Sequence, residues 1–305
     1  MSPQKEIIAV GSIALDHVET AFETRTEVLG GSAIYFGLSS ANFTSVHLVG
    51  VIGHDFPQEA IELLRRHNVY MTGVESRPGA TFRWGGRYNR DFTHRHTLFT
   101  HLGVFADFHP SAGKNFPSNS VLYLGNIQPI LQLELLDQVS SAELTIADTM
   151  NLWIANDNDT LWQVIRRVDL FLLNDEEARQ LTNTQSLQDA ARMILDNGPR
   201  AVVIKMGACG ATLFENNSSC FVPIYKVPNV VDPTGAGDTF AGGFTGHIAC
   251  CGADNLVDAV ITGAAVASFT VSDFSMDGVL TATPERIEKR RAIIQQKMTD
   301  DKKYK

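Results

Sequence analysis

The chain has 305 residues, with 25 lysines and arginines against 34 aspartates and glutamates, for a formal net charge of -9. At 44% hydrophobic and 19% charged residues it can bury a substantial core, which excludes a globally disordered protein. The acidic balance argues against nucleic acid or an acidic membrane as a partner, because either favours a basic face. An α/β enzyme and a binding protein both remain compatible with these numbers.

The sequence predicts neither a membrane segment nor an export signal. The apolar run at 7–10 is shorter than the core of a signal peptide, and no segment approaches the roughly 18 apolar residues of a spanning helix. The four cysteines show no Cys-x-x-Cys spacing. We therefore expect reduced thiols in a cytoplasmic protein, rather than disulfides or a metal site.

Short β-rich runs alternate with longer amphipathic stretches along the chain. The runs predict strands at 7–10, 46–52, 121–124, 144–147, 170–173 and 201–205. Helical periodicity predicts helices at 59–67, 131–139, 160–167, 176–181, 187–197 and 284–298. The strands are apolar almost throughout, as parallel strands covered on both faces are. The alternation therefore predicts an α/β fold with a doubly wound, mostly parallel sheet flanked by helices.

One stretch departs from this alternation. Residues 80–99 alternate aromatic, polar and charged side chains around Gly85 and Gly86, which is typical of antiparallel strands. Together with residues 14–28 they predict either a small sheet over one edge of the main domain or a pair of surface hairpins. The pattern alone favours neither.

The segment at 230–244 points most directly to a chemical function. Gly235 and Gly237 allow backbone angles at which consecutive amides converge on one point. A helix is predicted to begin there, and its dipole favours an anion at the N-terminus. The turn is therefore predicted to hold an oxyanion or a phosphate, with the carboxylate of Asp238 beside it.

A carboxylate beside an anion site is electrostatically unfavourable unless the chemistry needs both. Phosphoryl transfer to an alcohol does, because a base accepts the hydroxyl proton while fixed donors stabilise the transferring oxygens. The alternative is an ordinary helix start with Asp238 as a first-turn acid. Asp232, Pro233 and Thr234 before the turn, and the small residues after it, argue against that alternative.

These residues resemble the ribokinase-like (PfkB) carbohydrate kinases, whose second signature reads Asp-Thr/Pro-Thr-Gly-Ala-Gly-Asp followed by Gly-Gly. The resemblance extends over essentially the whole chain in family order. Its further matches are the opening strand with Asp16, the paired glycines Gly30 and Gly31, Gly53-x-Asp55, Asn174-x-x-Glu177 and the glycine loop at 205–211. Each shorter match is weak by itself, but their order and spacing together are specific.

The resemblance implies an ATP- and Mg²⁺-dependent kinase that phosphorylates a hydroxyl group of a small carbohydrate. It implies that Asp238 is the catalytic base and that the amides of Gly235, Ala236 and Gly237 form an anion hole. The residues that it implies for the nucleotide are Asn174, Glu177, Lys205, Gly207 and Gly210. It also implies that Glu177 holds Mg²⁺ through water, and that Asp232 and Thr234 ligate an activating monovalent cation such as K⁺.

The resemblance also implies that the small sheet is a lid over the acceptor. The implied acceptor contacts are Asp16, Gly30, Gly31, Tyr35, Arg83, Asn126 and Asp148. Tyr35 stands where many family members carry a sugar-binding Asn, and its ring would either stack on a ligand or fill space. Arg83 would contact a polar or anionic acceptor unless it is only an exposed arginine. Asn126 and Asp148 each end a predicted strand, where side chains face the ligand crevice of a doubly wound sheet.

Two alternatives stay open. A nucleoside kinase is one, since Tyr35 or Trp84 would stack on a base. A non-catalytic ligand-binding protein on the same scaffold is the other, although the intact Asp238 and Asn174-x-x-Glu177 argue against it. Family members use the lid either as a cover or as a dimer interface, and we expect a homodimer.

Overall fold

A sheet of nine strands forms the centre of the molecule in the computed structural model, which describes residues 4–92, 94–113, 116–216 and 218–303, with side chains to residue 300. In spatial order the strands are β13 (Ser218–Val222), β12 (Ala211–Glu215), β11 (Ala201–Lys205), β10 (Leu170–Asn174), β9 (Leu144–Asp148), β8 (Ser120–Leu124), β1 (Glu6–Val10), β4 (Val46–Gly53) and β5 (Val69–Arg77). Neighbours from β11 to β5 are parallel, whereas β12 and β13 form an antiparallel hairpin at the edge.

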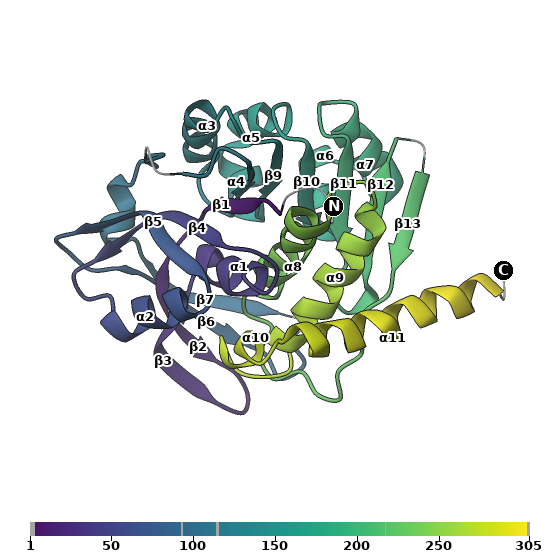
Figure 1. The fold of residues 1–305 in the computed structure, drawn as a ribbon. Helices are drawn as coiled ribbons and strands as arrows, with labels where there is room; N and C mark the ends of the chain where they lie inside the picture. The colour runs from purple at the N-terminus through teal and green to yellow at the C-terminus, as the bar shows by residue number, and fades with distance from the viewer. Residues whose placement is uncertain (1–3, 93, 114–115, 217, 304–305) are drawn as a thin grey trace.

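The strands are buried on both faces because helices cover each side of the sheet (Figure 1). In β1, Ile7 and Ala9 pack into one hydrophobic core while Ile8 and Val10 pack into the other, as strand alternation requires. The helices of the first core are α1 (Ser32–Ser40), α2 (Gln58–Arg66), α8 (Ala236–Cys251) and α9 (Leu256–Thr270). The second core takes α3 (Pro129–Gln138), α4 (Asn151–Asn156), α5 (Asn158–Ile165), α6 (Asp175–Thr182) and α7 (Leu187–Leu195). The predicted α/β architecture is confirmed.

A second, smaller sheet lies beside the main one and has the order β3-β2-β6-β7 (Figure 1). Its strands are β2 (Ala14–Glu19), β3 (Thr24–Gly30), β6 (Phe82–Tyr88) and β7 (Arg95–His101). β2 pairs with β6, so the two predicted stretches form one sheet. The prediction of a small sheet is confirmed, and the alternative of two separate hairpins is wrong.

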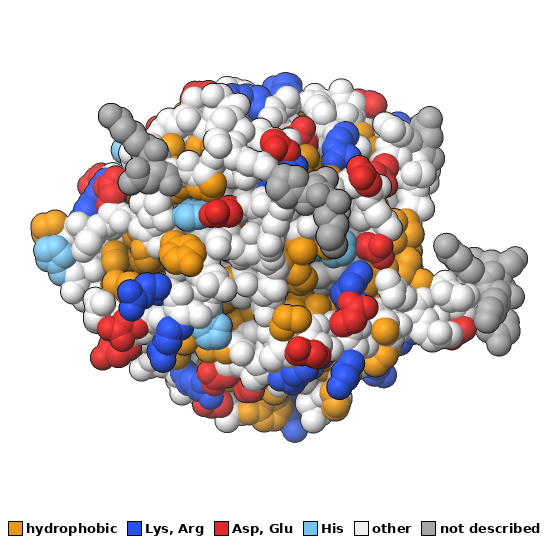
Figure 2. Space-filling view, in the orientation of Figure 1, with side chains coloured by type: hydrophobic (Ala, Val, Ile, Leu, Met, Phe, Trp, Pro, Cys, Tyr) orange, Lys and Arg blue, Asp and Glu red, His pale blue; other side chains and the backbone are white. Residues whose placement is uncertain are grey.

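The C-terminal part of the chain ends in α10 (Asp277–Leu280) and α11 (Pro284–Lys303), the latter running along the outside of the molecule (Figure 1). Acidic and basic side chains are interspersed over the face shown in Figure 2. Among the residues that the structure describes, no helix combines the length and the apolar character needed to cross a bilayer.

All six predicted strands and all six predicted helices are present within a few residues of their expected ends. The sequence did not predict the strands β5, β12 and β13, nor the helices α1, α4, α9 and α10. Two short 3₁₀ turns, at Gly103–Asp107 and Gly207–Cys209, complete the elements in the described ranges.

Candidate active site

The glycine-rich turn at 235–237 is the N-terminus of α8. Gly235 has φ of +73°, and a Cβ there would lie 2.3 Å from the ring of Tyr35. Both the left-handed conformation and the close ring require glycine at this position. The amide of Ala236 donates to the carbonyl of Pro233 at 3.2 Å, and Gly237 is exposed at the helix start. The structure thus places the three predicted anion-hole residues at a positive helix end.

Asp238 lies in the first turn of α8 and is half-buried. Burial, and after it the nearby carboxylate of Asp148, raises the pKa of Asp238 to about 7. The cations of Lys205 and Arg95 oppose this rise. A carboxyl group with a pKa near neutrality can accept a proton and release it again at physiological pH, as a general base must.

Three adjacent parallel strands end in polar side chains next to Asp238: β9 in Asp148, β10 in Asn174 and β11 in Lys205. The carboxyl ends of parallel strands form the ligand-binding edge of such a sheet. Lys205 Nζ lies 2.6 Å from Asp148 Oδ2, across the end of β10. Burial lowers the pKa of Lys205, but Asp148 and Glu177 together raise it by more than burial lowers it. The net pKa is therefore above its ordinary value. Lys205 is therefore a fixed positive charge at this edge.

Asn174 and Glu177 form a capping box at the start of α6. Asn174 Oδ1 accepts from the amide of Glu177 at 2.8 Å, and Glu177 Oε2 accepts from the amide of Asn174 at 2.7 Å. Burial raises the pKa of Glu177 to about 7, although Lys205 opposes the rise. The Asn-x-x-Glu motif therefore stabilises a helix start as well as carrying a carboxylate to the site. The spacing alone is a capping-box signature, so the sequence analysis missed a signal here.

Asp16, on β2, is a second buried carboxylate facing the site. Only 5% of it is exposed, and its Oδ1 has no hydrogen-bond partner among the described residues. Burial raises its pKa to about 7, and the amides of Gly31 and Trp84 lower it less. A Cβ on Gly30 would lie 2.0 Å from Asp16 Oδ2, so the glycine makes room for this carboxylate. A buried carboxylate oxygen without a partner is energetically unfavourable, and a hydrogen-bond donor on a ligand would satisfy it.

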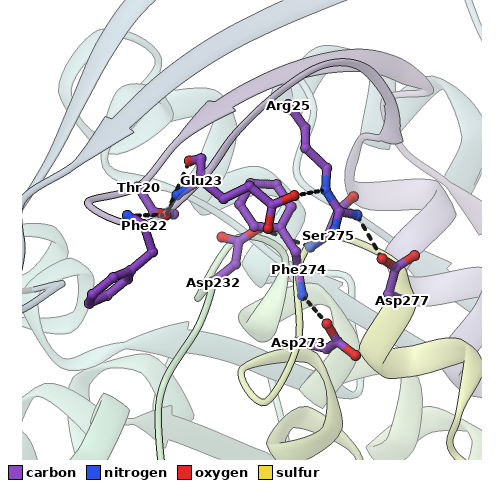
Figure 3. Close-up of polar contacts among 9 residues, drawn as sticks. All are labelled: Thr20, Phe22, Glu23, Arg25, Asp232, Asp273, Phe274, Ser275 and Asp277. Atoms are coloured by element: carbon purple, nitrogen blue, oxygen red, sulfur yellow. Dashed lines mark hydrogen bonds and ion pairs between the residues drawn. The ribbon is translucent and has the colours of Figure 1, made fainter.

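Asp232 is fully buried below the turn. Its Oδ1 accepts from the amide of Thr234 at 2.9 Å and its Oδ2 from the amide of Ser275 at 3.0 Å (Figure 3). The hydroxyl of Thr234 donates to the Tyr88 hydroxyl at 3.1 Å, across to the small sheet. No lysine or arginine of the described ranges forms an ion pair with Asp232. Within the described ranges, the hydrogen bonds of its carboxylate come from these two backbone amides.

The small sheet is attached to the loop that carries Ser275. Arg25 donates to Glu23 and to Asp277, each at 2.6 Å, and its guanidinium lies 4.6 Å from the centre of the Phe274 ring (Figure 3). Val18 and Tyr88 pack with Phe274 in a separate apolar cluster. Side chains of the small sheet therefore contact the segments around Asp232.

The other predicted acceptor residues have partners of their own. Tyr35 is 2% exposed, with its ring beneath Gly235. Arg83 forms ion pairs with Glu27 at 2.9 Å and with Asp55 at 2.8 Å, on the face of β6 opposite Trp84. The Asn126 amide accepts from Trp153 Nε1 at 2.8 Å and donates to Met150 Sδ at 3.1 Å.

Arg95 is a residue near the site that the sequence analysis did not select. Its guanidinium lies 5.2 Å from the Trp84 ring centre, and its positive charge opposes the rise that burial causes in the pKa of Tyr88. It also acts on the pKa of Asp238. Its position in a His-Arg-His run on an exposed strand gave no signal that it would lie near the turn.

Gly207 and Gly210 bound the turn that follows β11. Both have positive φ, +53° and +117°, and the amide of Met206 donates to the carbonyl of Gly210 at 2.8 Å. Nothing lies within 4 Å of a Cβ built on Gly207. The loop leaves open space beside the exposed backbone of 207–209, next to Lys205.

The described residues contain no cluster of three or more His, Cys, Asp or Glu side chains that would hold a metal ion by themselves. Glu177 nevertheless lies among the negative charges of Asp148 and Asp238. This donor set fits Mg²⁺, which keeps several waters and takes one or two carboxylates together with phosphate oxygens.

Comparison with known proteins agrees with this geometry. The profile of the pfkB family of carbohydrate kinases matches residues 4–281. A cytidine kinase of Thermococcus kodakarensis is 29% identical over 245 residues, covering 78% of this chain and 87% of that protein. The crystal structure of a Methanocaldococcus jannaschii nucleoside kinase covers 95% of this chain and 98% of its own, with a TM-score of 0.76 at 19% identity. The crystal structure of a Thermotoga maritima ribokinase covers 93% of this chain and 98% of its own, with a TM-score of 0.75 at 21% identity.

The fold and the site together define a phosphotransferase that acts on an alcohol group. The chain belongs to the pfkB family of carbohydrate kinases, whose members use ATP with a divalent metal. It is a sugar or nucleoside kinase.

Proposed function

We propose that the protein transfers the γ-phosphoryl group of ATP to a primary hydroxyl of a ribose-like unit, with Asp238 as general base. The observation that carries this proposal is the position of Asp238, a carboxyl group with a pKa of about 7 in the first turn of α8. The same helix start directs Gly237 and its neighbours at the place where phosphoryl charge develops. Base and anion site are therefore adjacent, as the reaction needs.

The acceptor binds between the small sheet and the main sheet. Asp16 Oδ1 accepts a hydrogen bond from a sugar hydroxyl and so gains the donor that it lacks in the free protein. Gly30 and Gly31 let the sugar approach the backbone. The small sheet acts as the lid of a single ribokinase-like domain formed by residues 1–305, and its closure excludes water from the reacting groups.

In the transfer step, the acceptor oxygen forms a bond to the γ-phosphorus while the bond from that phosphorus to the bridging oxygen of ADP breaks. The hydroxyl proton passes to Asp238, and the products are ADP and a phosphate ester. The nucleotide lies along Asn174, Glu177, Lys205, Gly207 and Gly210. Glu177 would hold Mg²⁺ through water, and the bound ion would supply positive charge to the phosphates.

The protein is also proposed to bind a monovalent cation and to form a homodimer. Asp232, which is fully buried, and Thr234 are the ligands for a monovalent cation such as K⁺. The free cysteines are compatible with a cytoplasmic protein. We also propose a homodimer through the lid.

A nucleoside is the second candidate acceptor, and the position of one aromatic ring favours it over a free sugar. Trp84 lies beside Asp16 in the pairing of β2 with β6 and presents a ring on the face of the small sheet that bears Tyr88. A base attached to a ribose held by Asp16 would reach such a ring. The similarity to a cytidine kinase over most of the chain supports this candidate.

An acceptor screen tests the proposal. ADP release is measured with ATP, Mg²⁺ and K⁺ over pentoses, hexoses, inositols and nucleosides, against Asp238→Asn as background. We expect one acceptor class to raise ADP release at least about a hundredfold above the reaction without acceptor. Ligand binding without ADP release above background for any acceptor would instead indicate the non-catalytic binding protein.

A further inference from the structure

The Asp148–Lys205 pair is held more rigidly than a surface ion pair. Asp148 is 3% exposed, and its Oδ1 accepts from the amide of Thr149 at 2.8 Å while Oδ2 pairs with Lys205. Its main-chain carbonyl accepts from the buried side chain of Gln132 at 3.0 Å. Both oxygens of the carboxylate are therefore occupied, and it is fixed at the end of β9. A carboxylate in this position is poorly placed to bind a sugar hydroxyl.

Lys205 extends from β11 toward the start of α8. Its Nζ lies 3.6 Å from the position that a Cβ on Gly237 would occupy. Only 16% of its side chain is exposed, so solvent screens its charge weakly. The ammonium group thus lies at the helix N-terminus that is proposed to receive the transferring phosphoryl group.

Lys205 also lies close to the base. The charged and titratable groups that act on Asp238 or on Lys205 come from the surrounding elements: Asp148 on β9, Lys205 on β11, Glu177 on α6 and Arg95 on β7. Among the residues that the structure describes, Asp148 is the one of these groups that forms an ion pair with Lys205. A lysine paired with Asp238 instead would weaken the base by stabilising its charged form. Because Lys205 pairs with Asp148 instead, it opposes the rise in the pKa of Asp238 only in part, and that pKa stays at about 7.

Resting on the function proposed above, we infer that Lys205 donates to a non-bridging oxygen of the transferring phosphoryl group and that Asp148 is a positioning residue that holds Lys205 there. This assigns Asp148 to the phosphoryl side of the site instead of to the acceptor. A fixed ammonium group at a developing oxyanion is worth far more in a partly buried site than in water. This role also explains why Asp148, at the end of β9, has partners on both of its carboxylate oxygens.

The test uses Mg²⁺ and ADP with and without fluoroaluminate, which mimics the phosphoryl group in transfer and needs no identified acceptor. Binding is measured by titration calorimetry on the full chain. We expect fluoroaluminate to tighten ADP binding to the wild type, and Lys205→Met to reduce that gain at least about tenfold while binding of ADP alone changes less than about threefold. Lys205→Arg should recover part of the gain.

The role of Asp148 is read from a double-mutant cycle. Asp148→Asn should reduce the fluoroaluminate gain in the presence of Lys205, but have no further effect in Lys205→Met, because Asp148 acts only through the lysine. The double variant, Asp148→Asn with Lys205→Met, removes both charges of this pair and leaves neither of them unpaired. It therefore controls for misfolding caused by an unpaired buried charge. Asp137→Asn, which breaks the exposed pair with Arg167 at 2.7 Å, is the matched control and should behave as wild type.

Three results would overturn the inference. They are a wild type in which fluoroaluminate leaves ADP binding unchanged, an Asp148→Asn variant that keeps the full gain, and equal effects of Asp148→Asn with and without Lys205. The proposed function fails separately, when the wild type binds these ligands but releases no ADP with any acceptor.

Discussion

At the scale of single residues, Gly235 determines whether the turn at 235–237 can form. It is the N-cap of α8 with φ of +73°, and the ring of Tyr35 fills the space where a side chain would be. Tyr35 itself is almost fully buried and packs beneath the turn. Because ring and backbone are in contact, a side chain at 235 would displace the amides that follow it.

We therefore predict that Gly235→Ala lowers kcat/KM at least about a hundredfold, since a small shift of fixed donors has a large effect on the rate. It should also destabilise the fold by about 1–3 kcal/mol because of the left-handed backbone. Gly252→Ala is the matched control: φ is +89° there, but nothing lies within 4 Å of the added Cβ. It should lose stability and keep activity. An equal loss of activity in both variants would contradict the assigned role of the turn.

At the scale of elements, the small sheet and the catalytic turn are joined by specific contacts. Tyr88 of β6 accepts from Thr234 at 3.1 Å, and the charge of Arg95 on β7 acts on the pKa of the same hydroxyl. Arg25 of β3 reaches Asp277 at the start of α10 (Figure 3). These contacts link the position of the small sheet to the segment that leads into Asp238.

Tyr88→Phe removes one hydroxyl and keeps the ring. We expect kcat to fall about tenfold and the free energy of unfolding to fall by only about 1 kcal/mol, because the net contribution of one hydrogen bond is small. Steady-state kinetics and denaturant unfolding measure the two quantities. Tyr70→Phe, on the edge strand β5 and 36% exposed, is the control and should change neither. A Tyr88→Phe enzyme with wild-type kcat would show that the hydroxyl contact does not matter for catalysis.

The elements that the sequence predicted well are those with a clear local pattern. The strands near the centre of the sheet are short apolar runs between turn residues, and the turn before α8 combines glycines with a helix start. Helix α9 was missed because it is apolar on nearly every side and shows no polar face to reveal the helical period. Strand β5 was missed because Gly73 interrupts its middle and its burial is mixed.

The site was predictable where residues close in sequence act together, as in 232–238 or the Asn174–Glu177 pair. It was not predictable where the chain brings distant strands together. The Asp148–Lys205 ion pair joins residues 57 positions apart across an intervening strand. Arg95 reaches the site only because β7 pairs with β6 in the small sheet.

At the scale of the whole molecule, two buried carboxyl groups and one half-buried carboxyl group oppose the general preference of acidic side chains for water. Asp16, Glu177 and Asp238 each have a pKa raised to about 7, chiefly by burial. A group whose pKa is higher in the folded than in the unfolded state makes the protein less stable as the pH rises between the two values. For these groups that window runs from their ordinary pKa values, 3.8 for Asp and 4.5 for Glu, to about 7.

Asp16→Asn isolates one of these contributions, because the amide cannot ionise. We predict that it raises Tm of the ligand-free protein at pH 8 by about 2 °C or more and has a smaller effect at pH 5, where Asp16 is protonated in the folded protein. Differential scanning calorimetry at both pH values measures this, with Asp137→Asn as an exposed control. A loss of stability of equal size at both pH values would contradict a raised pKa at Asp16.

The central claim is that Asp238 is the general base of a kinase, and Asp238→Asn tests it most directly. With the acceptor found in the screen, we predict that kcat/KM falls at least about a thousandfold, within the range expected for loss of a general base. Binding of ATP with Mg²⁺, measured by calorimetry, should stay near the wild-type value because the nucleotide contacts lie on other residues. Near-normal ATP binding with turnover retained within about tenfold of wild type would contradict the account.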